Sequence, residues 1–193
     1  DALIAAYSTL TAPVNDSLTT ADNSFVGSAG NDTFTASITA ASNTLNTGDA
    51  LVDSSTADSD SITITSSVAD LATASGTPMI TNIENVTFDF STVAAPTIDA
   101  ADITGGTVTV NQLLAGGGAG LNVNNIAGAD LSVGTGFSGT VTVTQGAGDV
   151  TITGGTETAI TVSGGTTGAL TINAGATATS ADGDATTGSV TVT

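Results

Sequence analysis

The sequence predicts an all-β fold in which residues 96–193 form a β-solenoid, and two observations lead to this prediction. Pairs of apolar residues, separated by one residue, recur every nine or ten residues between Leu121 and Ile172. Gly, Thr and Ala fill the intervals, so each unit reads as a strand of about five residues followed by a tight turn. We therefore expect very little helix.

The repeating pairs consist of Val, Ile and Leu, which suit pleated strands. They are Val108/Val110, Leu121/Val123, Leu131/Val133, Val141/Val143, Val150/Ile152, Ile160/Val162, Leu170/Ile172 and Val190/Val192. In a solenoid, two units form one coil of about twenty residues, and each coil stacks on the one before it. The same units could instead pair as antiparallel hairpins in a meander. The uniformity of the run favours the solenoid, because Gly and Thr suit its corners and its stacked hydroxyl groups.

Residues 22–95 form a second predicted β region, in which clusters of Asn, Asp and Gly separate short strands. Ser24–Ala36 contains two short runs with a Phe in each, around a Gly-Asn-Asp turn, and Ser61–Thr65 alternates polar and apolar residues. Ile80–Phe90 is the longest strand candidate. This region is therefore expected to be β-rich, with acidic turns.

Residues 1–21 make up a separate N-terminal segment. Leu3, Ile4, Tyr7 and Leu10 have helical spacing, and Pro13 would end a helix at that point. The segment is predicted to be a short helix on the main body or a docking element for a neighbouring subunit.

The charge of the chain is its most informative property. Among 193 residues there are 18 Asp and Glu but no Lys, Arg or His, which gives a formal net charge of −18. No side-chain salt bridge can form, so each carboxylate must be solvated, hydrogen-bonded or bound to a metal ion. Phosphate groups repel such a chain, which excludes nucleic acids and anionic membrane surfaces as partners. No apolar run is long enough to span a bilayer.

The same composition makes an enzyme an unfavourable interpretation. Without His and Cys, neither Ser-His-Asp nor Cys-His catalysis is available. A pair of Asp residues could still hydrolyse a glycosidic bond, but aromatic residues make up only 3% of the chain, which leaves few side chains to stack on sugars. Metal ligation is restricted to hard oxygen donors, which indicate calcium and, less strongly, magnesium.

Four segments carry a family resemblance. In chain order they read GNDTF, LNTGDAL, SDSITI and ITNIENVTF, beginning within SFVGSAGNDTFTA at Ser24–Ala36. This order resembles the RTX-type calcium-binding surface-layer proteins of Caulobacter-type bacteria and related RTX adhesins. In that family a G(T/S)xGNDTF segment precedes xxGDxLxGGxGTDxL and then an IxxIExxxx strand. The chain departs from the pattern after Leu51, where Val52-Asp53 stands in place of Gly-Gly.

The resemblance implies a calcium-binding site, an extracellular location on a bacterial cell surface, and self-assembly. It covers roughly residues 22–90 and extends more loosely over the remainder. The residues that match the family's ligand positions are Asn31, Asp32, Asp49 and Asp60, with Glu84 on the adjoining strand.

Two local patterns point to a cation independently of the family. If Ile80–Phe90 is one strand, Glu84 lies on its apolar face, where a lone carboxylate must be protonated or bind a cation. A bulge near Asn82 would instead turn Glu84 outward. Asp53, Asp58 and Asp60 lie close together in one turn and would repel one another without a counterion, unless the turn is a solvated loop.

These observations favour a secreted, calcium-dependent structural protein that polymerises with copies of itself into a surface layer, sheath or filament. Strand edges at the ends of a solenoid provide a means of polymerisation. The alternative is an adhesin or carbohydrate-binding stalk whose partner would be a cell-surface polysaccharide.

Overall fold

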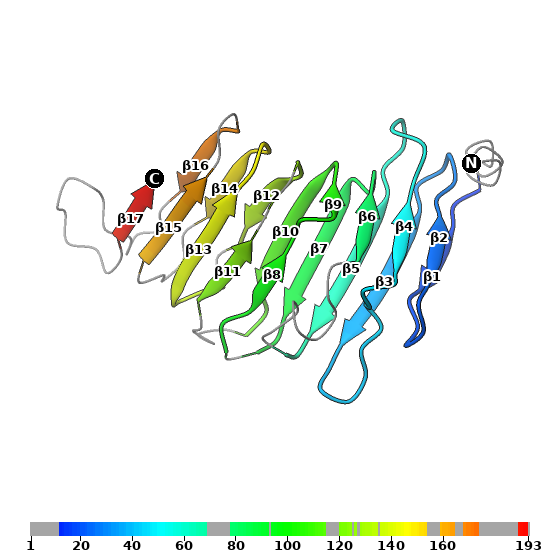
Figure 1. The fold of residues 1–193 in the computed structure, drawn as a ribbon, viewed down its shortest axis with the longest axis horizontal. Helices are drawn as coiled ribbons and strands as arrows, with labels where there is room; N and C mark the ends of the chain where they lie inside the picture. The colour runs from blue at the N-terminus through cyan, green and yellow to red at the C-terminus, as the bar shows by residue number, and fades with distance from the viewer. Residues whose placement is uncertain are drawn as a thin grey trace.

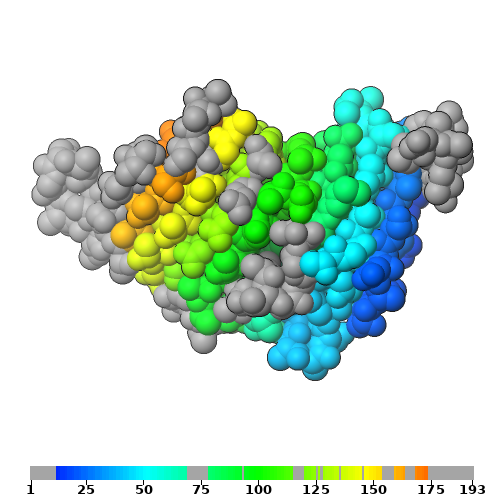
Figure 2. All heavy atoms as spheres, in the orientation of Figure 1, coloured from blue at the N-terminus to red at the C-terminus, as the bar shows by residue number. Residues whose placement is uncertain are grey.

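The computed structural model describes residues 12–68, 78–92, 94–114, 120–124, 126, 128–134, 136–153, 159–164, 168–173 and 189–192. The predicted all-β solenoid is confirmed, since this part of the chain consists of strands and connecting turns (Figure 1). Successive coils lie side by side along one axis, with Asn15–Ser17 at one end and Ser189–Val192 at the other. Figure 2 shows the coils as neighbouring bands of colour that follow the chain order. Within the same described ranges, no helix is long and apolar enough to cross a membrane.

Three parallel sheets run along the solenoid. The eight-stranded sheet contains β1 (Asn15–Ser17), β3 (Thr33–Ile38), β5 (Ser61–Ser66), β7 (Asn85–Phe90), β10 (Thr107–Gln112), β12 (Asp130–Val133), β14 (Val150–Thr153) and β16 (Leu170–Asn173). The four-stranded sheet contains β2 (Ser24–Val26), β4 (Ala50–Val52), β6 (Met79–Thr81) and β9 (Ile103–Thr104). The five-stranded sheet contains β8 (Thr97–Asp99), β11 (Leu121–Asn124), β13 (Thr140–Gln145), β15 (Ala159–Gly164) and β17 (Ser189–Val192).

Parallel pairing between these strands resolves the choice between solenoid and meander. Leu121 pairs with Val141 and Val150 pairs with Leu170, each twenty residues further along the chain. Two of the predicted units therefore form one coil, as expected. The coils continue through residues 22–95, where they are less uniform: Thr33 pairs with Ser61, twenty-eight residues later. The eight-stranded sheet runs without interruption across both predicted regions, and it includes β1 from the N-terminal segment.

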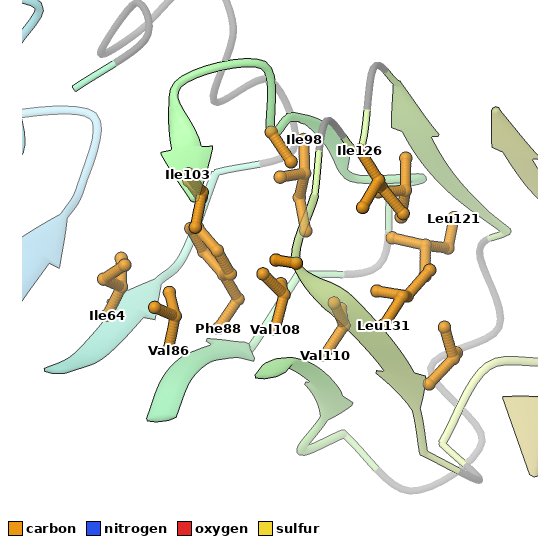
Figure 3. Packing of buried hydrophobic residues seen from close by; sticks show 14 of the residues in the cluster. Ile64, Val86, Phe88, Ile98, Ile103, Val108, Val110, Leu121, Ile126 and Leu131 are labelled. Atoms are coloured by element: carbon orange, nitrogen blue, oxygen red, sulfur yellow. The ribbon is translucent and has the colours of Figure 1, made fainter. Parts of the chain in front are cut away.

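The core is a set of apolar columns inside the solenoid. Because the strands pair in register, residues at equivalent positions stack from coil to coil. One such column is Phe34, Ile62, Val86, Val108, Leu131 and Val150, all buried. Figure 3 shows side chains from the eight-stranded sheet pointing inward, toward those of the other two sheets. Many outward positions carry hydroxyl groups instead, including Thr35, Thr63, Thr87 and Thr109 in one row.

Some corners between sheets bring the backbones of neighbouring coils into close approach. A Cβ atom built on Gly148 would overlap the carbonyl oxygen of Ala129, whereas one built on Gly128 meets nothing within 4 Å. Gly148→Ala should therefore lower the melting temperature by several degrees, because a clash that forces the backbone to shift costs about 1–3 kcal/mol. Gly128→Ala is the matched control and should leave the melting temperature within a degree or two of wild type, as expected for an unhindered site. Thermal unfolding followed by circular dichroism checks both variants, and equal losses would contradict this account of the corner.

The predicted continuous strand over Ile80–Phe90 is wrong. Its residues divide between β6 and β7, which belong to different sheets. The chain turns at Asn82, whose φ of 54° lies in the left-handed region that Asn tolerates better than most residues. Ile83 is buried just after the turn, so the inward positions change phase between Ile80 and Val86. The predicted helix at Leu3–Leu10 lies outside the described residues.

Candidate metal site

A row of carboxylates occupies the corner where the four-stranded sheet leads into the eight-stranded sheet. Asp32 directly precedes β3, Asp60 directly precedes β5, and Glu84 directly precedes β7. These three strands are neighbours in register, so their preceding residues stack in three successive coils. Asp53 and Asp58 belong to the same corner, because they lie in the turn that joins β4 to β5.

Backbone hydrogen bonds hold the stacked carboxylates in place. Asp32 Oδ1 accepts a hydrogen bond from the Val14 N–H at 2.6 Å. Asp60 Oδ1 accepts one from the Asp32 N–H at 2.8 Å, and Glu84 Oε2 accepts one from the Asp60 N–H at 2.8 Å. Each carboxylate thus reaches back to the equivalent residue one coil earlier, or to Val14 in the case of Asp32. This arrangement fixes the acidic side chains in a row along the corner.

Five carboxylates form two overlapping groups. The inner group is Asp32, Asp53 and Asp60, and the outer group is Asp58, Asp60 and Glu84. In each group, one oxygen from every carboxylate lies within 4.8 Å of the others. All three inner residues are buried, with at most 1% of their surface exposed, whereas Asp58 and Glu84 are half-buried. Either group could supply three oxygen ligands to one metal ion.

Several oxygens of these groups have no hydrogen-bond partner within the described part of the chain. Asp53 Oδ1, Asp60 Oδ2 and both side-chain oxygens of Asp58 are buried in this way. A buried carboxylate without compensation is costly, and this chain has no Lys, Arg or His to supply a positive charge. The corner therefore fits a hard cation, which would coordinate these oxygens.

Burial also alters the acidity of two of these groups, Asp60 and Asp53. Burial raises the pKa of Asp60 from its ordinary value of 3.8 to about 7, and repulsion by Asp53, Asp32 and Asp58 adds to the rise. The pKa of Asp53 rises to about 6, mainly through burial and further through repulsion by Asp58 and Asp32. Backbone hydrogen bonds oppose both shifts without cancelling them. Without a cation, these two carboxyl groups stay protonated to a higher pH than is usual for Asp.

Two residues support the inner group without belonging to it. Asp32 accepts hydrogen bonds from the Ser28 N–H at 2.5 Å and from the Ser28 hydroxyl at 2.9 Å. A Cβ atom built on Gly27 would overlap Asp53 Oδ1 and would lie 2.9 Å from Asp32 Oδ2. The absence of a side chain at Gly27 therefore leaves room for these two carboxylates. Ser28 was missed in the sequence because a single Ser in a Gly-rich turn carries no distinguishing signal.

The structure brings together most of the residues predicted as ligands, but not all of them. Asp32, Asp53, Asp58, Asp60 and Glu84 form the two groups. Asn31 is exposed beside the corner, where its side-chain oxygen accepts a hydrogen bond from the Ser59 N–H at 3.1 Å.

Asp49 lies outside both groups, at the opposite end of β4 from Asp53. Its carboxylate is buried, and Oδ1 accepts a hydrogen bond from the Asn23 N–H at 2.7 Å. Oδ2 accepts a hydrogen bond from the Asn46 N–H at 2.5 Å. Both oxygens are occupied by backbone donors, so Asp49 stabilises a turn between coils.

Acidic residues further along the chain form simpler contacts. Asp130 Oδ1 accepts a hydrogen bond from the Asp149 N–H, and Asp149 Oδ1 accepts one from the Ala169 N–H. Both contacts are exposed to solvent, as expected for acids at solenoid corners.

Comparison of the chain with protein-family models, with curated proteins and with solved structures gives no match. A functional proposal for this chain therefore rests on its own residues and their geometry.

Proposed function

We propose that this chain is a calcium-stabilised structural protein of an extracellular assembly, with a structural rather than a catalytic role. The observation that carries the proposal is the buried carboxylate corner, in which Asp53 and Asp60 each present an oxygen without a hydrogen-bond partner among the described residues. The carboxylates of this corner come from three successive coils. A cation bound there would hold those coils together and offset the repulsion between the acids.

Calcium fits this corner better than other common metals. Zinc and copper sites generally use His or Cys, which the chain lacks, whereas calcium takes six to eight oxygen ligands from carboxylates and carbonyl groups. Magnesium requires a nearly ideal octahedron and usually keeps several waters, which a buried corner accommodates poorly. Extracellular calcium modules bind at roughly 0.1–1 mM, so the proposed site would fill outside the cell. At about tenfold excess over the dissociation constant, one ion contributes ~1.4 kcal/mol to stability.

The assembly part of the proposal rests on the ends of the eight-stranded sheet. Among the residues that the structure describes, no strand pairs with the outer edge of β1 or of β16. An edge strand offers backbone donors and acceptors to a strand of another chain. A second copy of this chain is the partner that fits, because it presents a strand of the same solenoid. The resemblance to RTX-type surface-layer proteins points to the same kind of assembly.

Electron microscopy and circular dichroism of the purified chain test this function. We expect ordered polymers in calcium, their dissociation in EGTA with a weaker β-sheet signal, and recovery when calcium is restored. Magnesium at the same concentration should not restore them. A polymer unchanged by EGTA would contradict the role of calcium, and a monomer under all conditions would contradict assembly and favour the adhesin alternative.

A further inference from the structure

We propose that the carboxylate corner binds two cations that share Asp60, one at the inner group and one at the outer group. This inference rests on the proposed calcium-dependent function and specifies its stoichiometry. Asp60 is the one residue common to Asp32, Asp53 and Asp60 on the inner side and to Asp58, Asp60 and Glu84 on the outer side. Two ions, rather than one, would then link the three coils.

The geometry separates the five carboxylates into two coordination spheres. Calcium–oxygen distances are about 2.3–2.6 Å, so the ligands of one ion lie within roughly 5 Å of one another. Within each group, one oxygen from every carboxylate lies within 4.8 Å of the others, which meets this condition. The five carboxylates form two such groups of three, with Asp60 in both. Neither group includes all five carboxylates, so a single ion would leave part of the corner uncoordinated.

The charges lead to the same stoichiometry. Five ionised carboxylates carry five negative charges, and one divalent ion would leave three of these without compensation. Oxygens that have no hydrogen-bond partner in the described ranges are present in both groups: Asp53 Oδ1 in the inner group and both side-chain oxygens of Asp58 in the outer group. Asp60 can serve both ions, because a carboxylate has about four lone-pair sites and the Asp32 N–H uses one of them.

The two positions differ in depth, which gives the ions different properties. Every carboxylate of the inner group is buried, whereas Asp58 and Glu84 of the outer group are half-buried. The inner ion links the coils of β3 and β5, and the outer ion links the coils of β5 and β7. Release of the inner ion requires the corner to open, so this ion should dissociate more slowly than the outer one.

Equilibrium dialysis with radioactive calcium at neutral pH tests whether two ions share Asp60, by comparing the number of ions bound per chain in wild type and in variants. Compared with wild type, Asp60→Asn should bind two fewer ions per chain, whereas Asp58→Asn and Gly27→Ala should each bind one fewer. Asp58→Asn removes a half-buried carboxylate whose oxygens accept no hydrogen bond within the described part of the chain, so the substitution breaks no hydrogen bond found there. Gly27→Ala crowds the inner group without changing the charge. Asp49→Asn, outside both groups, is the control and should bind as many ions as wild type.

Release of calcium to a chelator, followed by stopped flow, gives a second and independent measurement. Wild type should show a fast and a slow phase, with the fast phase lost in Asp58→Asn and the slow phase lost in Gly27→Ala. If Asp60→Asn loses a single ion and Asp58→Asn loses none, the two-ion proposal is wrong while the calcium site stands. If none of these variants differs from wild type in bound calcium, the corner is not a calcium site and the proposed function fails with it.

Discussion

Replacing Asp60 with Asn should lower the melting temperature of this chain in calcium and raise it in EGTA. In calcium, Asp60→Asn should melt below wild type, because both cation groups lose their common ligand. In EGTA it should melt above wild type, because a neutral amide replaces a buried carboxyl group whose ionisation is opposed by Asp53, Asp32 and Asp58. The Asn side-chain oxygen can still accept the hydrogen bond from the Asp32 N–H. The same substitution thus changes the melting temperature in opposite directions in calcium and in EGTA.

Thermal unfolding of wild type and of Asp60→Asn, each with calcium and with EGTA, measures these two opposite shifts in melting temperature. At about a hundredfold excess over the dissociation constant, one ion adds ~2.7 kcal/mol. For a chain of this size, that corresponds to about 5–10 °C in the melting temperature of wild type for each bound ion. The calcium-dependent increment should almost vanish in Asp60→Asn.

Asp49→Asn separates the loss of a cation from the loss of a buried carboxylate. Asp49 is as deeply buried as Asp53, but both of its oxygens accept backbone hydrogen bonds. The Asn side chain keeps one oxygen as an acceptor, but its NH2 group faces the other backbone N–H and leaves that donor without an acceptor. The loss of this hydrogen bond costs about 1–3 kcal/mol of stability. Asp49→Asn should therefore melt lower than wild type by the same amount in calcium and in EGTA. A lower melting temperature for Asp60→Asn in both conditions would show that Asp60, like Asp49, only stabilises the backbone.

The periodic half of the chain reveals the fold because its corners are short and regular. Leu121, Val141 and Ile160 stack at intervals of nineteen or twenty residues, which is the period expected from two strand-and-turn units. In residues 22–95 the loops between strands differ in length, so no constant period marks the coils. Thr33, Ser61 and Asn85 stack at unequal intervals in the same sheet. The coils there follow from pairing in space, which a local pattern does not reveal.

The candidate metal site was predicted in part for the wrong reason. Glu84 belongs to the site because it lies at the corner before β7, and not because it lies on the apolar face of a long strand. The sequence does contain a signal of that corner, because the apolar residues are three apart at Ile80, Ile83 and Val86 but two apart from Val86 to Phe90. Asp49 matches a ligand position of the family pattern, yet, unlike Asp53, it accepts a backbone hydrogen bond at each of its two oxygens. Such differences depend on the stacking of coils, so they become visible only in the structure.

Acidity should stabilise this chain in EGTA and should have a much smaller effect on its stability in calcium. The pKa values of Asp53 and Asp60 in the folded chain, about 6 and about 7, lie above the ordinary value of 3.8. Between those limits, the folded chain binds more protons than the unfolded chain, so the free energy of unfolding falls as pH rises. In EGTA, the chain should therefore melt at a lower temperature near pH 8 than near pH 5.

Calcium should remove most of this loss, because the ion takes the place of the protons at the same oxygens. Protons compete with calcium for Asp53 and Asp60, so the calcium-dependent increment should shrink as pH falls through about 7 and 6. Melting curves recorded with calcium and with EGTA should converge near pH 5 and separate by several degrees near pH 8. A constant offset between the two series at every pH would mean that calcium binds elsewhere on the chain. Asp60→Asn should flatten the EGTA series, because it removes the carboxyl group with the higher pKa of the two.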